Sequence, residues 1–106
     1  MFDIVSTERA SLLVAKGVAV IDVREPGEWE QGHIPGARLM SLATLRAGRA
    51  SLPARGVLLV CARGMRSQTA ARVAAEQGIP VYSLAGGMHS WVQAGLPVTT
   101  KLSVAV

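Results

Sequence analysis

The stretch that decides the fold is Val57-Leu-Leu-Val-Cys61-Ala-Arg-Gly-Met-Arg-Ser67. Its first five residues are continuously apolar and rich in branched side chains, which is typical of a strand buried on both faces of a parallel sheet. Residues 67–77 follow with Ala and Val on one side of a helix, and Gly78 is placed to end it. A buried strand that passes through a short loop into a helix predicts an α/β fold.

The rest of the chain repeats this alternation of short apolar runs and helical segments. We expect further strands at 2–5, 18–23, 37–40 and 81–84, and further helices at 7–16, 25–31, 42–47 and around Trp91. Consecutive strand–helix–strand units form right-handed crossovers between parallel strands. The pattern therefore predicts a three-layer α/β sandwich, with a five-stranded parallel sheet flanked by helices.

The chain length fits one domain, which we place at residues 1–98. Residues 99–106 form a C-terminal tail of strand-like composition. Three roles stay open for this tail: it is disordered, it pairs with a sheet edge, or it mediates self-association.

Composition excludes several classes of protein. Half of the 106 residues are hydrophobic, which excludes intrinsic disorder, and no apolar run approaches a membrane span. The amino end lacks the apolar core of a signal peptide, so we expect a cytoplasmic protein. The net charge is +4, but the cations are scattered without interleaved aromatic residues, so small anions are expected as partners rather than nucleic acid.

The single cysteine, Cys61, excludes an internal disulfide and a cysteine-based zinc site. The two histidines and this cysteine lack metal-ligand spacing, so we expect no metal.

The loop after the central strand is the predicted site. In an open parallel sheet, ligands bind outside the carboxyl ends of the strands, here after Val23, Val60 and Leu84. Cys61 lies there, before the N-terminus of the 67–77 helix, where unpaired N–H groups and the helix dipole stabilise negative charge. Arg63 and Arg66 add positive charge, and Gly64 allows a turn that aims N–H groups inward. The loop therefore predicts a reactive thiolate, with Ser67 as a helix cap.

Three blocks carry a resemblance that covers about residues 5–98. They are Ile21-Asp-Val-Arg-Glu-Pro-Gly-Glu-Trp-Glu-Gln-Gly-His-Ile-Pro-Gly-Ala37, Cys61-Ala-Arg-Gly-Met-Arg-Ser67 and Leu84-Ala-Gly-Gly-Met-His-Ser-Trp-Val-Gln-Ala-Gly-Leu-Pro97. In this order and spacing, the chain resembles the single-domain rhodanese-like sulfurtransferases. The resemblance implies a five-stranded parallel sheet and a catalytic Cys61 that accepts sulfur from a donor such as thiosulfate, becomes a persulfide, and passes sulfur to cyanide or a thiol. It also implies a cradle of N–H groups around the sulfur, and no cofactor is expected. The residues expected to bind substrate are Ala62, Arg63, Gly64, Met65, Arg66, Ser67 and Arg24.

Other residues of these blocks are expected to support the site. Asp22 is expected to be paired in a fixed network, because a buried carboxylate needs a partner. Arg24 either belongs to the same network or attracts the anion. Gly86 and Gly87 are expected to let the backbone approach the cysteine loop closely.

The two histidines and two tryptophans receive structural interpretations. His33 is expected to be a structural histidine beside a tight turn, and His89 a surface residue. Trp29 and Trp91 are expected to pack in or around the core.

Three other functions are considered. Related phosphatases use Cys-x5-Arg, whereas Cys61 and Arg66 are separated by four residues, which suits one sulfur atom better than a phosphate group. A non-catalytic docking domain is disfavoured because the cysteine, the glycine and the arginines of the loop are all present. A persulfide carrier for a dedicated protein acceptor stays open.

Overall fold

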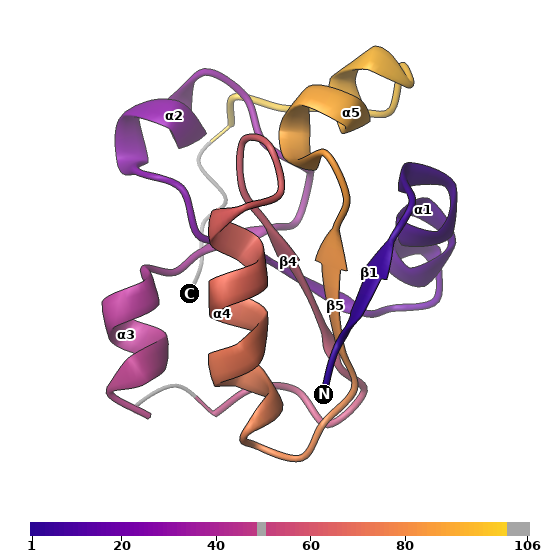
Figure 1. The fold of residues 1–106 in the computed structure, drawn as a ribbon. Helices are drawn as coiled ribbons and strands as arrows, with labels where there is room; N and C mark the ends of the chain where they lie inside the picture. The colour runs from indigo at the N-terminus through magenta and orange to yellow at the C-terminus, as the bar shows by residue number, and fades with distance from the viewer. Residues whose placement is uncertain (49–50, 102–106) are drawn as a thin grey trace.

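The computed structural model describes residues 1–48 and 51–101. Strands and helices alternate along the chain, as Figure 1 shows. The strands are β1 (Asp3–Val5), β2 (Ala19–Asp22), β3 (Arg38–Leu39), β4 (Val57–Val60) and β5 (Val81–Leu84). The helices are α1 (Thr7–Ala15), α2 (Pro26–Glu30), α3 (Leu42–Arg46), α4 (Arg66–Ala75) and α5 (Gly87–Gln93).

The five strands form one sheet in the order β1-β5-β4-β2-β3, and every pair is parallel. β4 occupies the middle of the sheet and all four of its residues are buried. This explains its continuously apolar sequence, because a central strand is covered on both faces. Cys61 therefore follows the carboxyl end of the central strand.

Side chains of β4 alternate between two hydrophobic cores, as the two-residue repeat of a strand requires. Leu58 and Val60 belong to the core under α1, α2 and α5. Val57 and Leu59 belong to the other core, under α3 and α4. Helices thus cover both faces of the sheet, and the predicted three-layer α/β sandwich is confirmed (Figure 1).

The elements lie where the sequence predicts them, and their ends differ by one or two residues. Cys61 lies just outside β4, and α4 begins at Arg66 rather than at residue 67. α1 is capped by Ser6, whose side chain accepts a hydrogen bond from the N–H of Arg9 at 3.2 Å. The β4–α4 loop lies at the carboxyl end of the central strand, between α2 and α5 (Figure 1).

The first residue of the predicted tail pairs with the loop that follows α2. Thr99 and His33 form an antiparallel bridge, with N–H to carbonyl distances of 2.9 and 2.8 Å. This bridge lies outside the five-stranded sheet. Residues 102–106, which make up most of the predicted tail, lie outside the described residues.

The two tryptophans pack in the same hydrophobic core, under α1, α2 and α5. Trp29 is 5% exposed and stacks on His33, with ring centroids 3.4 Å apart. Trp91 is 3% exposed, and its indole N–H donates to the carbonyl of Pro97 at 2.8 Å.

None of the helices in the described ranges is both long and apolar enough to cross a bilayer.

Candidate active site

Cys61 is buried at the start of the loop, with 1% of its surface exposed. The N–H of Gly64 donates a hydrogen bond to the Cys61 sulfur at 3.0 Å. Gly64 has φ +96°, in the region that favours glycine, and this backbone turn aims its N–H inward. A Cβ at this position would lie 3.0 Å from the nitrogen of Gly86. Glycine is therefore required here both by the turn and by the packing.

The surroundings of the sulfur lower the pKa of Cys61 below its ordinary value. Burial is the largest single influence and acts in the opposite direction, because it disfavours the charged thiolate. Hydrogen bonds outweigh the effect of burial on this pKa. The Ser67 hydroxyl contributes most, followed by the N–H groups of Ser67, Gly64 and Arg63. The thiolate is thus stabilised chiefly by hydrogen-bond donors of the loop and the first turn of α4.

Ser67 does not cap α4, contrary to the expectation from the sequence. The cap position belongs to Met65, which makes no side-chain cap hydrogen bond. Ser67 lies inside the first turn, fully buried, with its hydroxyl 3.5 Å from the Cys61 sulfur. The helix begins one residue earlier than predicted, so the serine side chain turns toward the thiol instead of toward the helix end.

Gly86 and Gly87 bring α5 against the cysteine loop. The N–H of Met88 donates to the carbonyl of Cys61 at 2.8 Å, and the N–H of His89 donates to the carbonyl of Ala62 at 3.0 Å. A Cβ on Gly87 would overlap the carbonyl of Cys61 and lie 2.7 Å from the carbonyl carbon of Ala62. Gly87 therefore permits this close approach, whereas a Cβ on Gly86 would overlap the side chain of Ser90 in the same helix.

Asp22 and Arg24 form a buried ion pair beside the loop. The Arg24 Nε and Nη2 atoms donate to the Asp22 carboxylate at 2.9 to 3.2 Å, and the Arg24 N–H donates to Oδ1 at 3.0 Å. Arg24 also donates to the carbonyls of Gly32 at 2.8 Å and Glu28 at 3.3 Å. The guanidinium thus ties the end of β2 to α2 and the turn after it. This geometry favours the network interpretation for both residues, and binding of an anion by Arg24 stays a prediction.

Arg66 pairs with Glu28 of α2 across the edge of the site. Its two terminal nitrogens donate to the two carboxylate oxygens at 2.7 and 2.8 Å. Hydrogen bonding to Arg66 lowers the pKa of Glu28 to about 2, and the same contact raises the pKa of Arg66. The sequence did not single out Glu28. The other loop arginine, Arg63, is exposed and makes no ion pair within the described residues.

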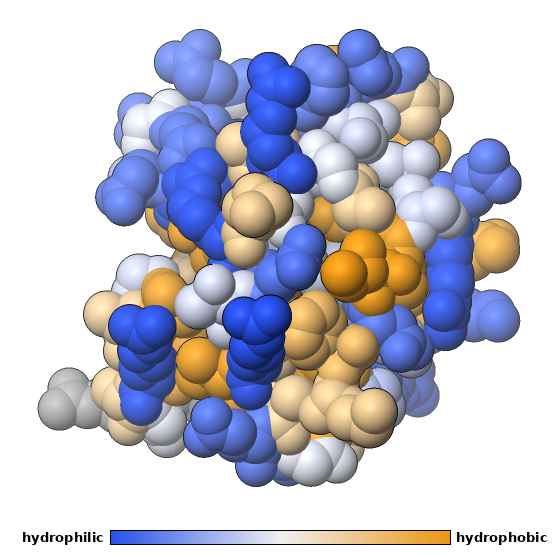
Figure 2. All heavy atoms as spheres, in the orientation of Figure 1, coloured by the Kyte–Doolittle hydropathy of each residue, from blue (hydrophilic) through white to orange (hydrophobic). Residues whose placement is uncertain are grey.

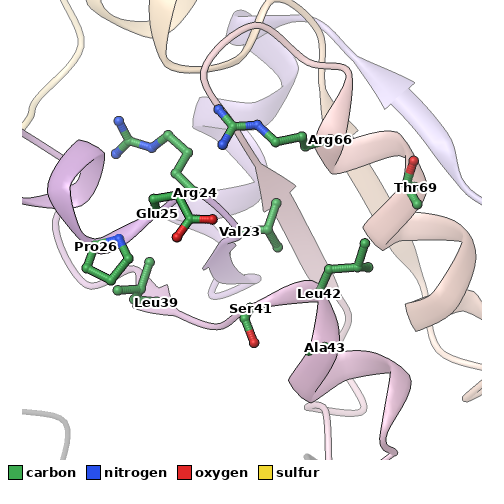
Figure 3. A pocket seen from close by; sticks show the side chains of 10 residues that line it. All are labelled: Val23, Arg24, Glu25, Pro26, Leu39, Ser41, Leu42, Ala43, Arg66 and Thr69. Carbon is green, nitrogen blue, oxygen red and sulfur yellow. The ribbon is translucent and has the colours of Figure 1, made fainter.

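Two grooves flank the loop. One of about 580 Å³ lies between α2, α3 and the start of α4, where Arg66 projects along the same side as Arg24 (Figure 3). It is lined by Val23, Arg24, Glu25, Pro26, Leu39, Ser41, Leu42, Ala43, Arg66 and Thr69. The other, of about 660 Å³, is lined by Arg24, Gln31, Gly32, Ala62, Arg63, Met88, His89, Val92, Gln93 and Val98.

Neither histidine contacts the sulfur. His33 is fully buried, and its Nδ1 lies 3.0 Å from the carbonyl of Trp29. His89 is exposed on α5. In the described ranges, no three His, Cys, Asp or Glu side chains come together in a group that could hold a metal ion.

Comparison with known proteins agrees with this geometry. The family pattern described as the rhodanese-like domain matches residues 6–94. The chain belongs to the rhodanese-like family. The predicted resemblance is thereby confirmed for most of the chain.

Two curated relatives of this rhodanese-like domain are named thiosulfate sulfurtransferase GlpE. The protein from Pseudoalteromonas translucida is 37% identical over 76% of this chain and 78% of its own length. The protein from Shewanella oneidensis is 39% identical over 76% of this chain and 81% of its own length.

Two solved structures are similar to the whole domain. The rhodanese-related protein from Thermoplasma volcanium is 27% identical, with a TM-score of 0.85 over 94% of this chain and 100% of its own. A protein from Rhodopseudomonas palustris, described as a possible tyrosine phosphatase, is 28% identical, with a TM-score of 0.77 over 92% of this chain and 85% of its own. The second likeness makes the phosphatase alternative worth testing directly.

Proposed function

We propose that this rhodanese-like domain is a thiosulfate sulfurtransferase that carries the transferred sulfur on Cys61. The observation that carries the proposal is the Cys61 sulfur, buried in a short loop and facing N–H and O–H donors that lower its pKa. The names of the curated relatives support the same activity.

The reaction has two displacement steps, as covalent catalysis by a cysteine requires. The Cys61 thiolate attacks the outer sulfur of thiosulfate, the S–S bond of the donor breaks, and its electron pair leaves with sulfite. Cyanide or an acceptor thiolate then attacks the outer sulfur of the persulfide, and the pair of the S–S bond returns to Cys61. Atoms and electrons balance without a further oxidant or reductant. Because hydrogen-bond donors of the loop lower the pKa of the Cys61 thiol, the proposed reaction uses no separate general base.

The loop acts on the charge that both steps bring to it. Thiosulfate, the thiolate and the terminal persulfide sulfur are all anionic, and N–H donors fixed in advance stabilise such charge without reorganising. Ala62, Arg63, Gly64, Met65, Arg66 and Ser67 are proposed to surround the transferred sulfur. Arg63 is proposed to attract the donor because it is exposed and unpaired within the described residues.

Cyanide and small thiols are proposed as acceptors, and a protein thiol is the second candidate. The exposure of Met65 at 74% and of Val92 at 55% favours that candidate, because one lies in the cysteine loop and the other on α5, which packs against this loop. Figure 2 shows apolar and hydrophilic side chains side by side on one face of the molecule. The proposed location is the cytoplasm, as predicted from the sequence, where thiols such as that of Cys61 are kept reduced.

The test compares sulfur transfer from thiosulfate to cyanide with hydrolysis of an aryl phosphate by the same protein. We expect measurable thiosulfate turnover and negligible phosphatase activity, because four residues between Cys61 and Arg66 leave room for one sulfur atom. One glycine inserted beside Gly64 should slow sulfur transfer and improve phosphate binding, since the loop widens while its charges remain. Efficient phosphate-ester hydrolysis by the unmodified protein would overturn the proposal.

A further inference from the structure

A buried chain of two hydroxyl groups lies behind the Cys61 sulfur. The Ser67 oxygen is 3.5 Å from the sulfur and 2.8 Å from the oxygen of Ser83. Both serines are 0% exposed. Ser83 belongs to β5, and α4 packs across β4 and β5, which brings the serine of the strand against the serine of the helix.

The number of protons on the two serine hydroxyls limits the directions of their hydrogen bonds. Each serine has one O–H donor and accepts through its oxygen. Within the described residues, the Ser83 hydroxyl has the Ser67 oxygen as its hydrogen-bond partner. If Ser67 donated to Ser83, the Ser83 proton would be buried without an acceptor, which is costly. In the neutral state the Cys61 thiol donates to the Ser67 oxygen. Once Cys61 is ionised, the favoured arrangement is therefore Ser83 donating to Ser67, which leaves the Ser67 proton free to point at the thiolate.

We propose that Ser83 is a positioning residue, which orients the hydroxyl of Ser67 as a donor to the Cys61 sulfur. It does so without touching the sulfur. Accepting a hydrogen bond also makes Ser67 a stronger donor, because linked hydrogen bonds polarise one another in a low-dielectric interior. The proposal rests on the role of Cys61 as nucleophile, but it concerns the thiol itself and not the identity of the sulfur donor.

The charged groups around Cys61 come from several elements. Arg63 lies on the cysteine loop and Arg66 begins α4. The Asp22–Arg24 pair lies at the end of β2, Glu28 lies on α2, and His89 lies on α5. Substitution of either buried serine changes none of these charges. A difference in thiol ionisation between serine variants must therefore come from the hydroxyls.

The test is the rate at which iodoacetamide alkylates Cys61, measured across pH. Only the thiolate reacts at a useful rate, and the chain contains one cysteine, so the profile reports this thiol alone. Ser83→Ala should move the midpoint to higher pH and lower the rate at pH 7 about two- to tenfold, the loss expected for one hydrogen bond. Ser67→Ala should shift the profile at least as far. In the double variant, Ser83→Ala should add nothing to Ser67→Ala, because its effect passes through Ser67.

Two further variants separate positioning from loss of packing. Ser83→Thr keeps the hydroxyl and should keep the wild-type midpoint. Ser6→Ala removes a helix cap outside the site and should destabilise the protein without moving the midpoint. An unchanged midpoint in Ser83→Ala, additive shifts in the double variant, or equal shifts from Thr and Ala would overturn the proposal. Because alkylation needs no thiosulfate, a failure here is distinguishable from a lack of sulfur transfer.

Discussion

Arg63 lies in the cysteine loop and Arg66 lies at the start of α4, and their surroundings differ. Arg66 is held by Glu28, whereas Arg63 is exposed beside the second groove. Arg63→Ala should therefore raise the KM for thiosulfate about three- to tenfold with kcat little changed, the pattern of a lost binding contact to a charged ligand. Steady-state kinetics at fixed ionic strength measures both parameters.

The matched control for Arg63 is Arg72→Ala. Arg72 is also exposed, but it lies in the last turn of α4, away from the loop, and its loss changes the net charge equally. The control should leave KM unchanged. Equal increases of KM in the two variants would show that overall charge, and not a specific contact, attracts the donor.

The Glu28–Arg66 ion pair predicts a particular dependence of stability on pH. The pKa of Glu28 is about 2 in the folded protein, below the ordinary value of 4.5, so ionised Glu28 stabilises the fold. This contribution is complete above about pH 4.5 and is lost as the pH falls through about 2. Because the pair is partly exposed, we expect it to contribute only about 0–1 kcal/mol.

Glu28→Gln isolates that charge, because the amide oxygen can still accept the Glu25 N–H, as the carboxylate does at 3.0 Å. Urea unfolding of both proteins at several pH values measures the difference in unfolding free energy. The difference should be constant above pH 4.5 and should shrink toward pH 2. A difference that does not change with pH would rule out the ion pair as its cause.

Glu28 also shows where prediction from the sequence stops at the scale of single residues. Cys61, Gly64 and the arginines stand out because their types are unusual after a buried strand. Nothing local marks Glu28 as the partner of Arg66, since the two lie 38 residues apart and meet only once α2 is placed beside α4.

At the scale of elements, the contact between α5 and the cysteine loop controls the site. Gly87 has φ +56° and its Cα faces the backbone of Cys61 and Ala62 with no room for a methyl group. Gly87→Ala should destabilise the protein by roughly 2–4 kcal/mol, through backbone strain together with overpacking. It should also slow sulfur transfer, because α5 must move away from the loop. Thermal unfolding and the thiosulfate assay measure the two effects.

Gly95→Ala is the control for this substitution. Gly95 follows the same helix with φ +73°, and a Cβ there would meet no atom within 4 Å. Gly95→Ala should lower the unfolding free energy only through backbone strain, by about 1–2 kcal/mol, and should keep full activity. Equal losses of stability and activity in both variants would show that close packing at Gly87 is unimportant.

Ser67 and Ser83 show how far the sequence predicts α4 and β5 and the contacts between them. Apolar patterning identified α4 and β5, because burial dictates which residues are apolar. The sequence could not show that α4 begins one residue early, and this shift turns Ser67 from a cap into a partner of the thiol. A polar residue inside a short buried strand was the available signal for Ser83, but its partner depends on how α4 lies across the sheet.

At the scale of the whole molecule, the Asp22–Arg24 pair joins the sheet to α2 and the turn after it. Both side chains are buried, at 1% and 7% exposure. Asp22→Asn leaves a buried guanidinium without its counter-charge and should cost about 3–5 kcal/mol of unfolding free energy. The Tm should fall by more than about 10 °C.

Asp3→Asn provides the comparison for Asp22. Asp3 pairs with Arg9 at 3.9 Å, and both side chains are more than half exposed. This substitution should cost less than about 1 kcal/mol. Similar decreases in Tm for the two variants would contradict a structural role for the buried pair.

The most direct test of the central claim is the mass of the intact protein after incubation with thiosulfate. The wild-type chain should become heavier by one sulfur atom, and cyanide should remove that mass while forming thiocyanate. Cys61→Ser should show neither the added mass nor turnover. A wild-type protein that turns over thiosulfate without the added mass, or a Cys61→Ser variant that retains activity, would contradict sulfur transfer through Cys61.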